Sequence, residues 1–513
     1  MDLFRLKSLR VRDHQVFQHP TEILFSAETD TFSQGLPYFT LILGLNGTGK
    51  SNLLKLIIEI FRVAYNKKVD ERTATYPGGK YSLEYFYEDG NYTILNTLGW
   101  SNSEALTFSE GESEFEKGLR FFKDGTEIPP PELRLPESII ALSILLTDKF
   151  LFTKDGGMFP PYKYFGVRRD SNTAGTKSLI ARIIDCTFIA AARESFLASI
   201  KEILTFLDLE QEFLVSYSPR YKHYFFKEDL TVGAFDEFFN NYKKILPRRT
   251  TAPWSVAVYK KIKEESPELI PRLVKLLRYL SQHLEVVENS KSKYFAFDIF
   301  QQDEQFQQFF PLLPDLHRLD LISYPRITLR KKGQYHIDDS SSGEYHFIST
   351  MISILSAITP HSVILIDEPE VSLHPKWQMQ YIAFLNKVFA EYNSAHFIIC
   401  SHSHFMVSDM PPGNSTVLSL KRANDTIVSE VQPEAFGWSA EEILYSIFEV
   451  RSMRNSFLEY DLTKLVTLVN RGSSDYPEIR RITNKISSLV LSEGDPLVVL
   501  REKALKYLAE RNA

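Results

Sequence analysis

The sequence predicts an α/β protein whose core is a mixed central sheet with an antiparallel β subdomain. An inserted, mainly helical lobe and a helical C-terminal tail complete the expected fold. A short apolar segment at 39–43 is followed by a glycine-rich turn and an apolar helical segment. Two more apolar segments, 361–366 and 395–400, are separated by one helical segment, as expected of buried parallel strands. Residues 3–26 and 80–100 alternate apolar and polar side chains, which indicates antiparallel strands.

Composition limits the classes of protein to which the chain can belong. Its 513 residues exceed one ordinary domain, and 65 acidic against 59 basic side chains give a net charge of −6. That balance argues against a chain built simply as a basic surface for nucleic acid. Cys186 and Cys400 are too few for a disulfide framework, and no apolar run approaches the ~18 residues of a membrane span. Because the N-terminus also lacks the apolar stretch of a signal peptide, we expect a cytoplasmic protein without membrane contact.

Changes of pattern along the chain predict four segments. Residues 1–175 and 301–430 carry the strand-forming core, and 176–300 form the inserted lobe, whose helices are short and interrupted by prolines. The lobe has no sustained heptad repeat, which excludes a long coiled-coil arm. Its basic clusters at 243–263 could contact phosphate backbones, but acidic neighbours favour a solvated surface. Residues 431–513 form the helical tail, which is either a docking surface for a partner or a packed cap.

The strongest motif is Gly44-Leu45-Asn46-Gly47-Thr48-Gly49-Lys50-Ser51, which matches GxxxxGK[ST] between a strand and a helix. Its glycines allow backbone N–H groups to converge on phosphate oxygens at the start of the helix. Lys50 is expected to reach the β- and γ-phosphates of ATP as a catalytic residue, and the Ser51 hydroxyl to ligate Mg²⁺. The residues assigned to nucleotide binding here are Gly44, Asn46, Gly47, Thr48, Gly49, Lys50, Ser51 and Asn52.

A second motif places two carboxylates at the end of an apolar strand, in Val363-Ile364-Leu365-Ile366-Asp367-Glu368. Asp367 is expected to hold the magnesium shell, and Glu368 to polarise the attacking water as the catalytic base. The alternative is a pair of solvated acids at the start of a helix, where negative charge is favoured. The phosphate loop in the same chain makes that alternative weaker.

Two further segments fit the same reaction. Ser341-Ser342-Gly343-Glu344 precedes an apolar helix, and small residues at a helix start can bind an anion. An ordinary capping box from Ser341 to Glu344 is the alternative. His402 directly follows the strand at 395–400 and could donate to a γ-phosphate, with His404 as the weaker candidate and a plain loop histidine as the alternative.

Together, the segments GLNGTGKSN, SSGE, ILIDEPE, SLHP and SHSHF resemble the ATP-binding-cassette (ABC) ATPases of the chromosome-maintenance and DNA-break-repair type. The resemblance covers residues 1–175 and about 300–430, and implies an ABC-type P-loop ATPase core that binds ATP and Mg²⁺. It also implies that Ser341 and Gly343, in a signature-like loop, cap ATP held by a second subunit. A homodimer or higher oligomer would then share its ATP sites. Arg10 resembles the arginine on the adenine side.

Two features depart from the family pattern. Ser340 stands where a leucine usually precedes the signature serine. The segment Thr147-Asp148-Lys149-Phe150 lies where a glutamine loop would contact magnesium, but it contains no glutamine. That magnesium contact is therefore left unassigned.

Three further segments, which match less specifically, indicate a narrower group of related proteins. Leu135–Ala141, Tyr164–Arg168 and Phe436–Leu444 are similar to the ATPase subunit of bacterial Septu-type and retron-associated antiphage systems. That subunit works beside a separate HNH nuclease. The resemblance therefore implies an ATPase that regulates an associated nuclease or effector in an antiphage defence complex, with nucleic acid reached through the partner or the complex.

No nuclease centre is expected in this chain. Leu491–Asp495 resembles the opening of the nuclease module of OLD-type relatives, but too few residues follow it, and no HNH or Cys/His metal spacing occurs elsewhere. Two other functions stay open: a nucleotide-held scaffold with little turnover that sequesters a nuclease partner, and a DNA-repair ATPase that acts directly on DNA. Glu368 together with His402 favours hydrolysis over the scaffold. The acidic charge balance and the lack of a long coiled coil disfavour the repair enzyme.

Overall fold

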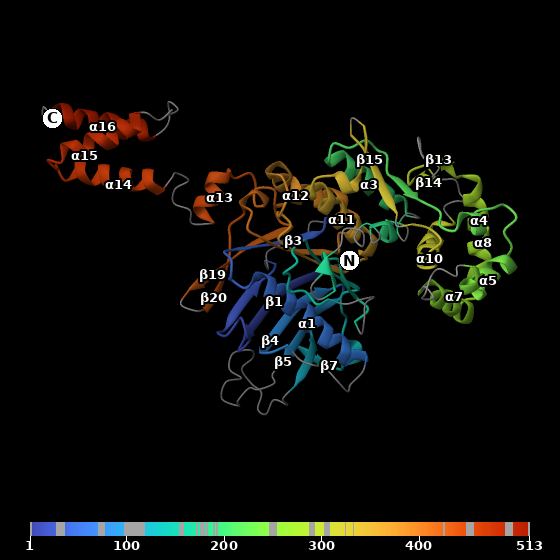
Figure 1. Ribbon diagram of the computed structural model, residues 1–513. Helices are drawn as coiled ribbons and strands as arrows, with labels where there is room; N and C mark the ends of the chain where they lie inside the picture. The colour runs from blue at the N-terminus through green and yellow to red at the C-terminus, as the bar shows by residue number, and fades with distance from the viewer. Residues whose placement is uncertain are drawn as a thin grey trace. The chain divides into compact units, whose positions relative to one another are not determined.

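The structure is a computed structural model of the 513-residue chain (Figure 1). The residues that it describes are 3–26, 36–69, 77–96, 118–152, 159–170, 173–174, 180, 183–187, 190, 193–245, 254–286, 293–301, 308–323, 325–331, 333–423, 426–447, 456–487 and 496–510. The chain divides into two compact units, Met1–Trp438 and Ser439–Ala513. A search of the described helices for one long and apolar enough to cross a membrane finds none.

A seven-stranded sheet forms the centre of the first unit, in the strand order β20-β19-β3-β18-β17-β8-β9. Its strands are β3 (Tyr38–Gly44), β8 (Ser138–Ser143), β9 (Tyr162–Tyr164), β17 (Ser362–Asp367), β18 (His396–Ser401), β19 (Ser415–Ala423) and β20 (Thr426–Val431). Neighbouring strands pair in parallel, except for the antiparallel edge strand β20. The predicted strands at 39–43, 361–366 and 395–400 are β3, β17 and β18, which confirms the parallel pairing expected from their continuous apolar character.

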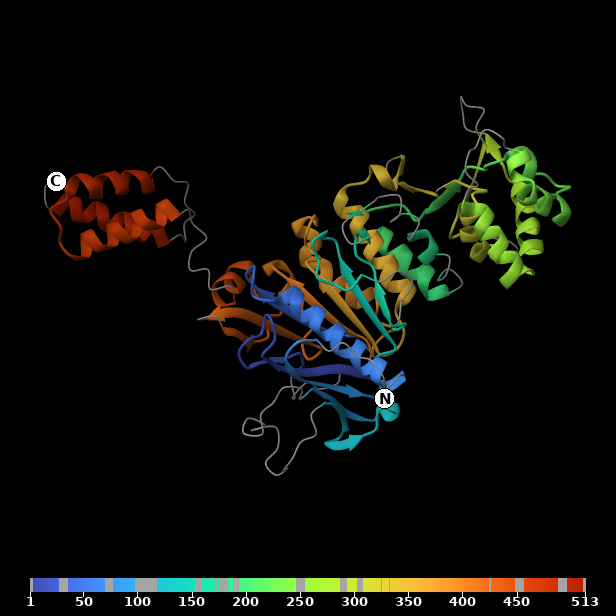
Figure 2. The ribbon, with the colours of Figure 1, turned by 60° about the horizontal axis from the view of Figure 1, so that its bottom comes forward.

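A six-stranded antiparallel sheet forms the expected β subdomain, in the order β2-β1-β4-β5-β6-β7. Its strands are β1 (Phe4–Arg12), β2 (Thr21–Leu24), β4 (Lys80–Tyr87), β5 (Gly90–Asn96), β6 (Leu119–Lys123) and β7 (Thr126–Ile128). Helix α1 (Lys50–Val69) follows β3 and shares one hydrophobic core with strands of both sheets (Figure 2). Its buried residues include Leu53, Leu54, Leu56 and Ile58, which lie around most of the helix because apolar neighbours surround it.

A second group of helices carries the remaining functional loops. Helices α3 (Glu194–Phe206), α11 (Ser342–Ala357) and α12 (Pro375–Val388) pack through aromatic side chains. The ring of Phe206 lies 5.0 Å from that of Phe347 on α11 and 4.3 Å from that of Phe384 on α12. Because aromatic rings bury large areas, these contacts hold the three helices together, and the SSGE and SLHP segments lie at the starts of α11 and α12.

The predicted insertion, residues 176–300, contains strands as well as helices, and its sheet takes in strands up to residue 336, past the boundary predicted from the sequence. The helices are α4 (Lys222–Phe225), α5 (Val232–Asn240), α6 (Tyr242–Ile245), α7 (Trp254–Glu265), α8 (Leu269–Gln282) and α10 (Leu313–Arg318). The antiparallel sheet has the order β13-β14-β12-β15-β16, with β12 (Leu214–Tyr217), β13 (Glu285–Val286), β14 (Lys293–Asp298), β15 (Arg326–Arg330) and β16 (Gln334–His336). Sequence analysis predicted a mainly helical lobe and not this sheet, because β12 finds its partners β14 and β15 about 80 and 110 residues further along the chain. Of the basic clusters noted in the lobe, Arg248 and Arg249 lie outside the described residues.

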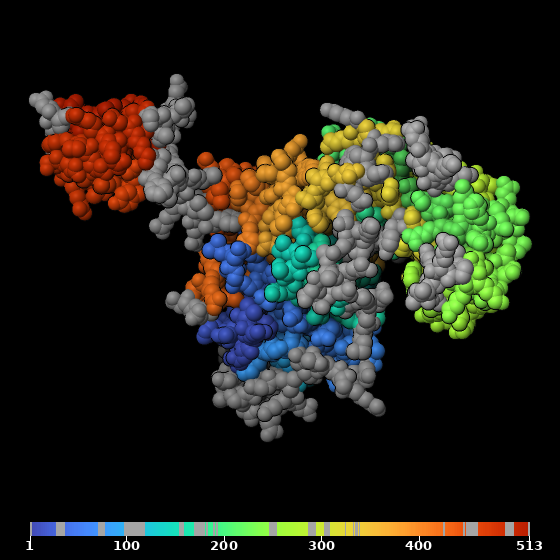
Figure 3. All heavy atoms as spheres, viewed as in Figure 1, coloured from blue at the N-terminus to red at the C-terminus, as the bar shows by residue number. Residues whose placement is uncertain are grey.

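The second unit is helical, as predicted for the tail. Its helices are α13 (Ala440–Ser446), α14 (Ser456–Asn470), α15 (Tyr476–Ser487) and α16 (Pro496–Glu510). Leu465, Ile479, Ile482 and Leu508 belong to a core that contains only residues of α14, α15 and α16, and these helices form a compact body (Figure 3). The segment Leu491–Asp495, weighed above as the opening of a nuclease module, lies outside the described residues.

Candidate nucleotide-binding site

The phosphate loop connects β3 to α1 in the conformation that its glycines allow. Gly47 and Gly49 have φ angles of 83° and 92°, a region that residues with a β-carbon rarely adopt. Gly44 lies against the neighbouring strand, since a β-carbon added there would meet the Leu420 carbonyl oxygen at 2.6 Å. The Thr48 hydroxyl donates to the Leu45 carbonyl at 2.9 Å and holds the turn closed. Backbone N–H groups at the start of α1 therefore have the arrangement that binds phosphate in P-loops.

Lys50 and Ser51, the first residues of α1, meet the carboxylates at the end of β17. Lys50 Nζ donates to the Gly44 carbonyl at 2.8 Å and lies 3.9 Å from Glu368 Oε1. The Ser51 hydroxyl donates to Asp367 Oδ1 at 3.1 Å. The pairing of β17 with β18, and of β18 with β3, brings these groups together from positions more than 300 residues apart.

His402 joins the same group of side chains from the loop after β18. Its Nε2 lies 2.7 Å from Lys50 Nζ and 2.9 Å from Glu368 Oε1. This nitrogen accepts from Lys50 in one tautomer of the neutral ring and donates to Glu368 in the other. Glu368 itself has a φ of 55°, and its N–H donates to the Cys400 carbonyl at 2.9 Å. A positive φ at a residue with a side chain is costly and is typical of functional positions.

Burial shifts the pKa values of the charged side chains in the site. It lowers the pKa of the Lys50 ammonium, and the nearby carboxylates of Glu368 and Asp367 act in the opposite direction. Burial also raises the pKa of Asp367 to about 6, while its hydrogen bond from Ser51 opposes the shift. The Asp367 carboxylate thus lies in surroundings that favour a nearby cation.

The donors at Ser51 and Asp367 fit Mg²⁺. A hydroxyl and a carboxylate are hard oxygen ligands, and Mg²⁺ is usually bound by one or two carboxylates together with waters and substrate phosphates. A buried carboxylate whose charge is disfavoured by its surroundings would be stabilised by a divalent ion. Within the described part of the chain, no group of three or more His, Cys, Asp or Glu side chains could hold a metal ion. The chemistry of the donors therefore matches a magnesium site completed by nucleotide phosphates.

The signature-like loop begins helix α11. Ser341 is its N-cap and forms a complete capping box with Glu344, with the Ser341 hydroxyl accepting from the Glu344 N–H at 3.2 Å. Ser341 is exposed, whereas Gly343 is buried. A β-carbon added at Gly343 would meet the Ser372 carbonyl oxygen at 2.4 Å, so Gly343 packs directly on the loop that follows β17.

The remaining predicted residues lie at the rim of the site or beyond it. Asn46 is exposed at the tip of the phosphate loop, and Asn52 is half-buried in the first turn of α1. Arg10 lies on β1 and pairs with Glu22 on β2, its Nε 2.7 Å from Glu22 Oε1. His404, the weaker histidine candidate, begins a short 3₁₀ helix two residues after His402.

Sequence analysis missed a set of polar contacts around His402. The His402 N–H donates to Glu370 Oε1 at 2.5 Å. Burial raises the pKa of Glu370, and the hydrogen bond from His402 opposes that shift. Gln378 on α12 donates to the Leu373 carbonyl and accepts from the Ser403 hydroxyl. Glu370 is visible in the segment ILIDEPE, just after Asp367 and Glu368, but no sequence pattern indicates Gln378.

Asp148, in the segment where a glutamine loop would be expected, forms a buried ion pair. Asp148 is completely buried, and its carboxylate accepts from the Arg168 guanidinium at 2.6 and 2.9 Å. The Tyr164 hydroxyl and the Phe150 N–H donate to the same carboxylate at 2.7 and 2.9 Å. Its hydrogen-bonding capacity is thus used within the protein, although its charge contributes to the raised pKa of Asp367.

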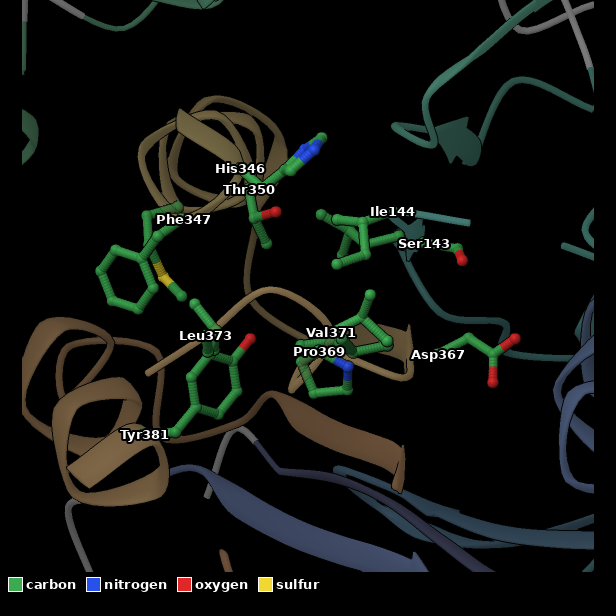
Figure 4. Close-up of a pocket in the computed structure, with 13 residues that line it drawn as sticks. Ser143, Ile144, His346, Phe347, Thr350, Asp367, Pro369, Val371, Leu373 and Tyr381 are labelled. Carbon is green, nitrogen blue, oxygen red and sulfur yellow. The ribbon is translucent and has the colours of Figure 1, made fainter. Parts of the chain in front are cut away.

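A pocket separates α11 from the loop that follows β17. It is open to solvent and is lined mainly by apolar side chains. Asp367 and Ser143 lie at one end, and Leu373 and Tyr381 at the other (Figure 4). The loop after β17 therefore borders open space on the side of α11.

Comparisons with known proteins agree with an ATPase. Residues 226–407 match the family described as AAA ATPase domain. This range contains Asp367, Glu368 and His402, while the phosphate loop lies before it. A search of curated proteins finds no match to this chain.

Solved structures that resemble the chain include heads of SMC proteins. The SMC head domain from Thermotoga maritima is 12% identical with a TM-score of 0.35, covering 84% of this chain and 99% of that one. An Smc head domain from Pyrococcus furiosus, bound to the C-terminal domain of ScpA, is 12% identical with a TM-score of 0.33, covering 88% and 100%. Likeness at this level carries no inference about function. The P-loop topology, the grouping of the site residues and the family match together support an ATPase of the ABC type.

Proposed function

We propose that the chain binds ATP with Mg²⁺ and hydrolyses it to ADP and phosphate. The observation that carries this proposal is the convergence of Lys50, Ser51, Asp367, Glu368 and His402 at the ends of three neighbouring strands. Phosphoryl transfer needs positioning and electrostatic stabilisation, and these five side chains provide both. Bound Mg²⁺ would neutralise charge that develops on the phosphate oxygens.

Each side chain has a part in this reaction. The Lys50 ammonium, now 2.8 Å from the Gly44 carbonyl, would bind the β- and γ-phosphates together with the amides of the loop. Ser51 and Asp367 would hold the metal ion. Glu368 would accept the proton of the attacking water, and His402 would donate to the γ-phosphate while its Nε2 remains close to Glu368.

The test measures phosphate release and nucleotide binding by the purified chain. Lys50→Ala should abolish ATP binding, because the buried ammonium that meets the phosphates is lost. Lys55→Ala is the matched control, since Lys55 lies on the same helix and pairs with Glu59 at 3.5 Å. Loss of ATP binding in both variants, or in neither, would contradict the proposed role of Lys50. Tight ATP binding without release of phosphate by the parent chain would favour the nucleotide-held scaffold.

Two copies of the chain are proposed to share each ATP. Support comes from the exposed Ser341 at the start of α11, where an anion is favoured, and from the ABC-type fold. Mixing Lys50→Ala chains with Ser341→Arg chains yields dimers in which one site has both defects and the other has neither. Because such dimers have one intact site of two, about half the parent activity is expected from them. No recovery after confirmed mixing would show that each chain completes its own site.

The proposed setting is a cytoplasmic antiphage complex with a separate HNH-type nuclease. Its support is the resemblance of Leu135–Ala141, Tyr164–Arg168 and Phe436–Leu444 to Septu-type and retron-associated ATPase subunits. The helical second unit is a candidate surface for that partner. Protection against phage should disappear when the neighbouring nuclease gene is deleted. DNA degradation by the chain alone, with Lys50→Ala as the control for contaminants, would contradict this proposal.

A further inference from the structure

The loop between β17 and α12 contacts the His402 backbone, the Gln378 side chain and the start of α11. This loop, residues 368–373, begins with Glu368 and turns back on itself, because the Leu373 N–H donates to the Glu370 carbonyl at 3.0 Å. Ser372 has a φ of 68°, so the turn is held in a costly conformation at both Glu368 and Ser372.

On one side, loop 368–373 holds the backbone of His402. Glu370 Oε1 accepts the His402 N–H at 2.5 Å, and the carboxylate is largely withdrawn from water. Hydrogen bonds from backbone amides to carboxylates are charge-assisted and stronger than neutral ones. The position of the His402 ring beside Glu368 and Lys50 therefore depends on the Glu370 carboxylate.

A second bridge reinforces the first. Gln378 Nε2 donates to the Leu373 carbonyl at 2.9 Å, and Gln378 Oε1 accepts from the Ser403 hydroxyl at 2.7 Å. One amide side chain thus ties the end of loop 368–373 to the residue after His402. The two bridges fix the loop and the histidine segment to each other at both ends.

On its other side, loop 368–373 contacts the start of α11. Gly343 packs on the Ser372 carbonyl so closely that a β-carbon would stand 2.4 Å from the oxygen. Val371 and Leu373 of the same loop line the pocket beside α11 (Figure 4). Because Gly343 meets the Ser372 carbonyl so closely, a shift of α11 would displace the loop.

We infer that Glu370 is a positioning residue, which sets the His402 ring for catalysis and transmits displacements of α11 to it. This inference rests on the proposed ATP hydrolysis and deepens it, because it names the connection from the signature-like loop to the water-polarising pair. Glu370 Oε1 contacts the backbone of His402, so Glu370 acts through His402. Its removal therefore lowers the rate of turnover and leaves ATP affinity unchanged.

The kinetic test compares Glu370→Ala, Glu370→Gln and His402→Ala in the full chain. Glu370→Ala should lower kcat about ten-fold, as expected when a hydrogen bond to a charged group is lost, with no change in KM or in the Kd for ATP. Glu370→Gln keeps an acceptor oxygen for the His402 N–H and should recover most of the rate. Glu391→Ala, at an exposed glutamate, is the control and should match the parent.

The double variant gives the decisive comparison. In a His402→Ala background, Glu370→Ala should change kcat by less than about two-fold, because residues that act as a unit are not additive. An equal ten-fold loss in both backgrounds would overturn the inference while leaving ATP hydrolysis intact. A parent chain that releases no more phosphate than Lys50→Ala would instead overturn the proposed function, and the inference with it.

A second readout does not depend on hydrolysis. Hydrogen exchange of a peptide containing His402–Phe405 should be faster in Glu370→Ala than in Glu370→Gln or the parent, because the His402 N–H loses its acceptor. Unchanged exchange in Glu370→Ala would show that the hydrogen bond does not order this segment, and would contradict the inference whatever the kinetics.

Discussion

Replacing Arg168 with methionine tests how the buried carboxylate beside the nucleotide site is held. Arg168 lies at the start of β10 (Arg168–Asp170) and donates twice to Asp148, whose side chain is 0% exposed. Methionine keeps much of the aliphatic volume and removes the charge. Asp148 would then keep its hydrogen bonds from Tyr164 and Phe150 but lose its only described cationic partner.

The expected cost follows from burial. Removing one partner of a buried ion pair leaves an uncompensated charge and typically costs about 3–5 kcal/mol. The equivalent change in an exposed pair costs less than about 1 kcal/mol. Arg120 and Glu127 form a pair on the β subdomain whose arginine is 17% exposed, much like Arg168, but whose carboxylate is 49% exposed, so Arg120→Met is the matched control for burial of the carboxylate.

Hydrogen exchange measures the local loss of stability in the full chain. At about 1.4 kcal/mol per factor of ten, Arg168→Met should speed exchange in residues 144–152 by about 10²- to 4 × 10³-fold. The double variant Asp148→Leu, Arg168→Met removes both charges and should recover part of the protection. Changes of less than about ten-fold in Arg168→Met, matching those in Arg120→Met at its own site, would refute the reasoning that burial makes the Asp148 pair strong.

Three further predictions concern other parts of the chain. His396 is fully buried, accepts from the Leu6 N–H and donates to Thr40, and burial lowers its pKa well below 6.5. Below about pH 6.5 the unfolded chain takes up a proton that the folded chain does not, so Tm should fall between pH 7.5 and 5.5, and His396→Gln should reduce that fall. Gly343→Ala should lower the rate of phosphate release without weakening ATP binding, because the new methyl group meets the Ser372 carbonyl. A rate equal to that of the parent would show that displacing loop 368–373 does not affect hydrolysis. Ile482→Ala should cost about 2–5 kcal/mol in the core of the second unit and speed exchange across α14 and α15, while exchange in β3 stays at the parent level.

The central parts of the fold could be predicted because their signals are local. The apolar character of 39–43, 361–366 and 395–400 identifies buried strands, and the glycines of the phosphate loop identify a turn that few other residues could form. Since parallel strands end at one edge of a sheet, placing these strands together also brings Lys50 towards Asp367.

The sequence could not show what depends on pairing between distant segments. The five-stranded sheet of the insertion joins β12 to β14 and β15. The alternation of apolar and polar side chains in the four residues of β12 does not indicate with which strands it pairs. A glutamate in a loop and a glutamine near a helix start are common, so Glu370 and Gln378 do not stand out in the sequence. Only the fold brings them to His402 and Ser403. The capping box of Ser341 was visible as a pattern, but the packing of Gly343 on Ser372 was not.

Glu368→Gln gives the most direct measurement of the central claim, that this chain hydrolyses ATP with Glu368 as the base. The amide keeps nearly the same shape beside His402 and Lys50 but cannot accept the proton of the attacking water. The variant should bind ATP as tightly as the parent in an equilibrium titration and release phosphate about 10²- to 10⁴-fold more slowly, the range expected for loss of general-base catalysis. Phosphate release at the parent rate by Glu368→Gln, with ATP binding retained, would contradict the assignment.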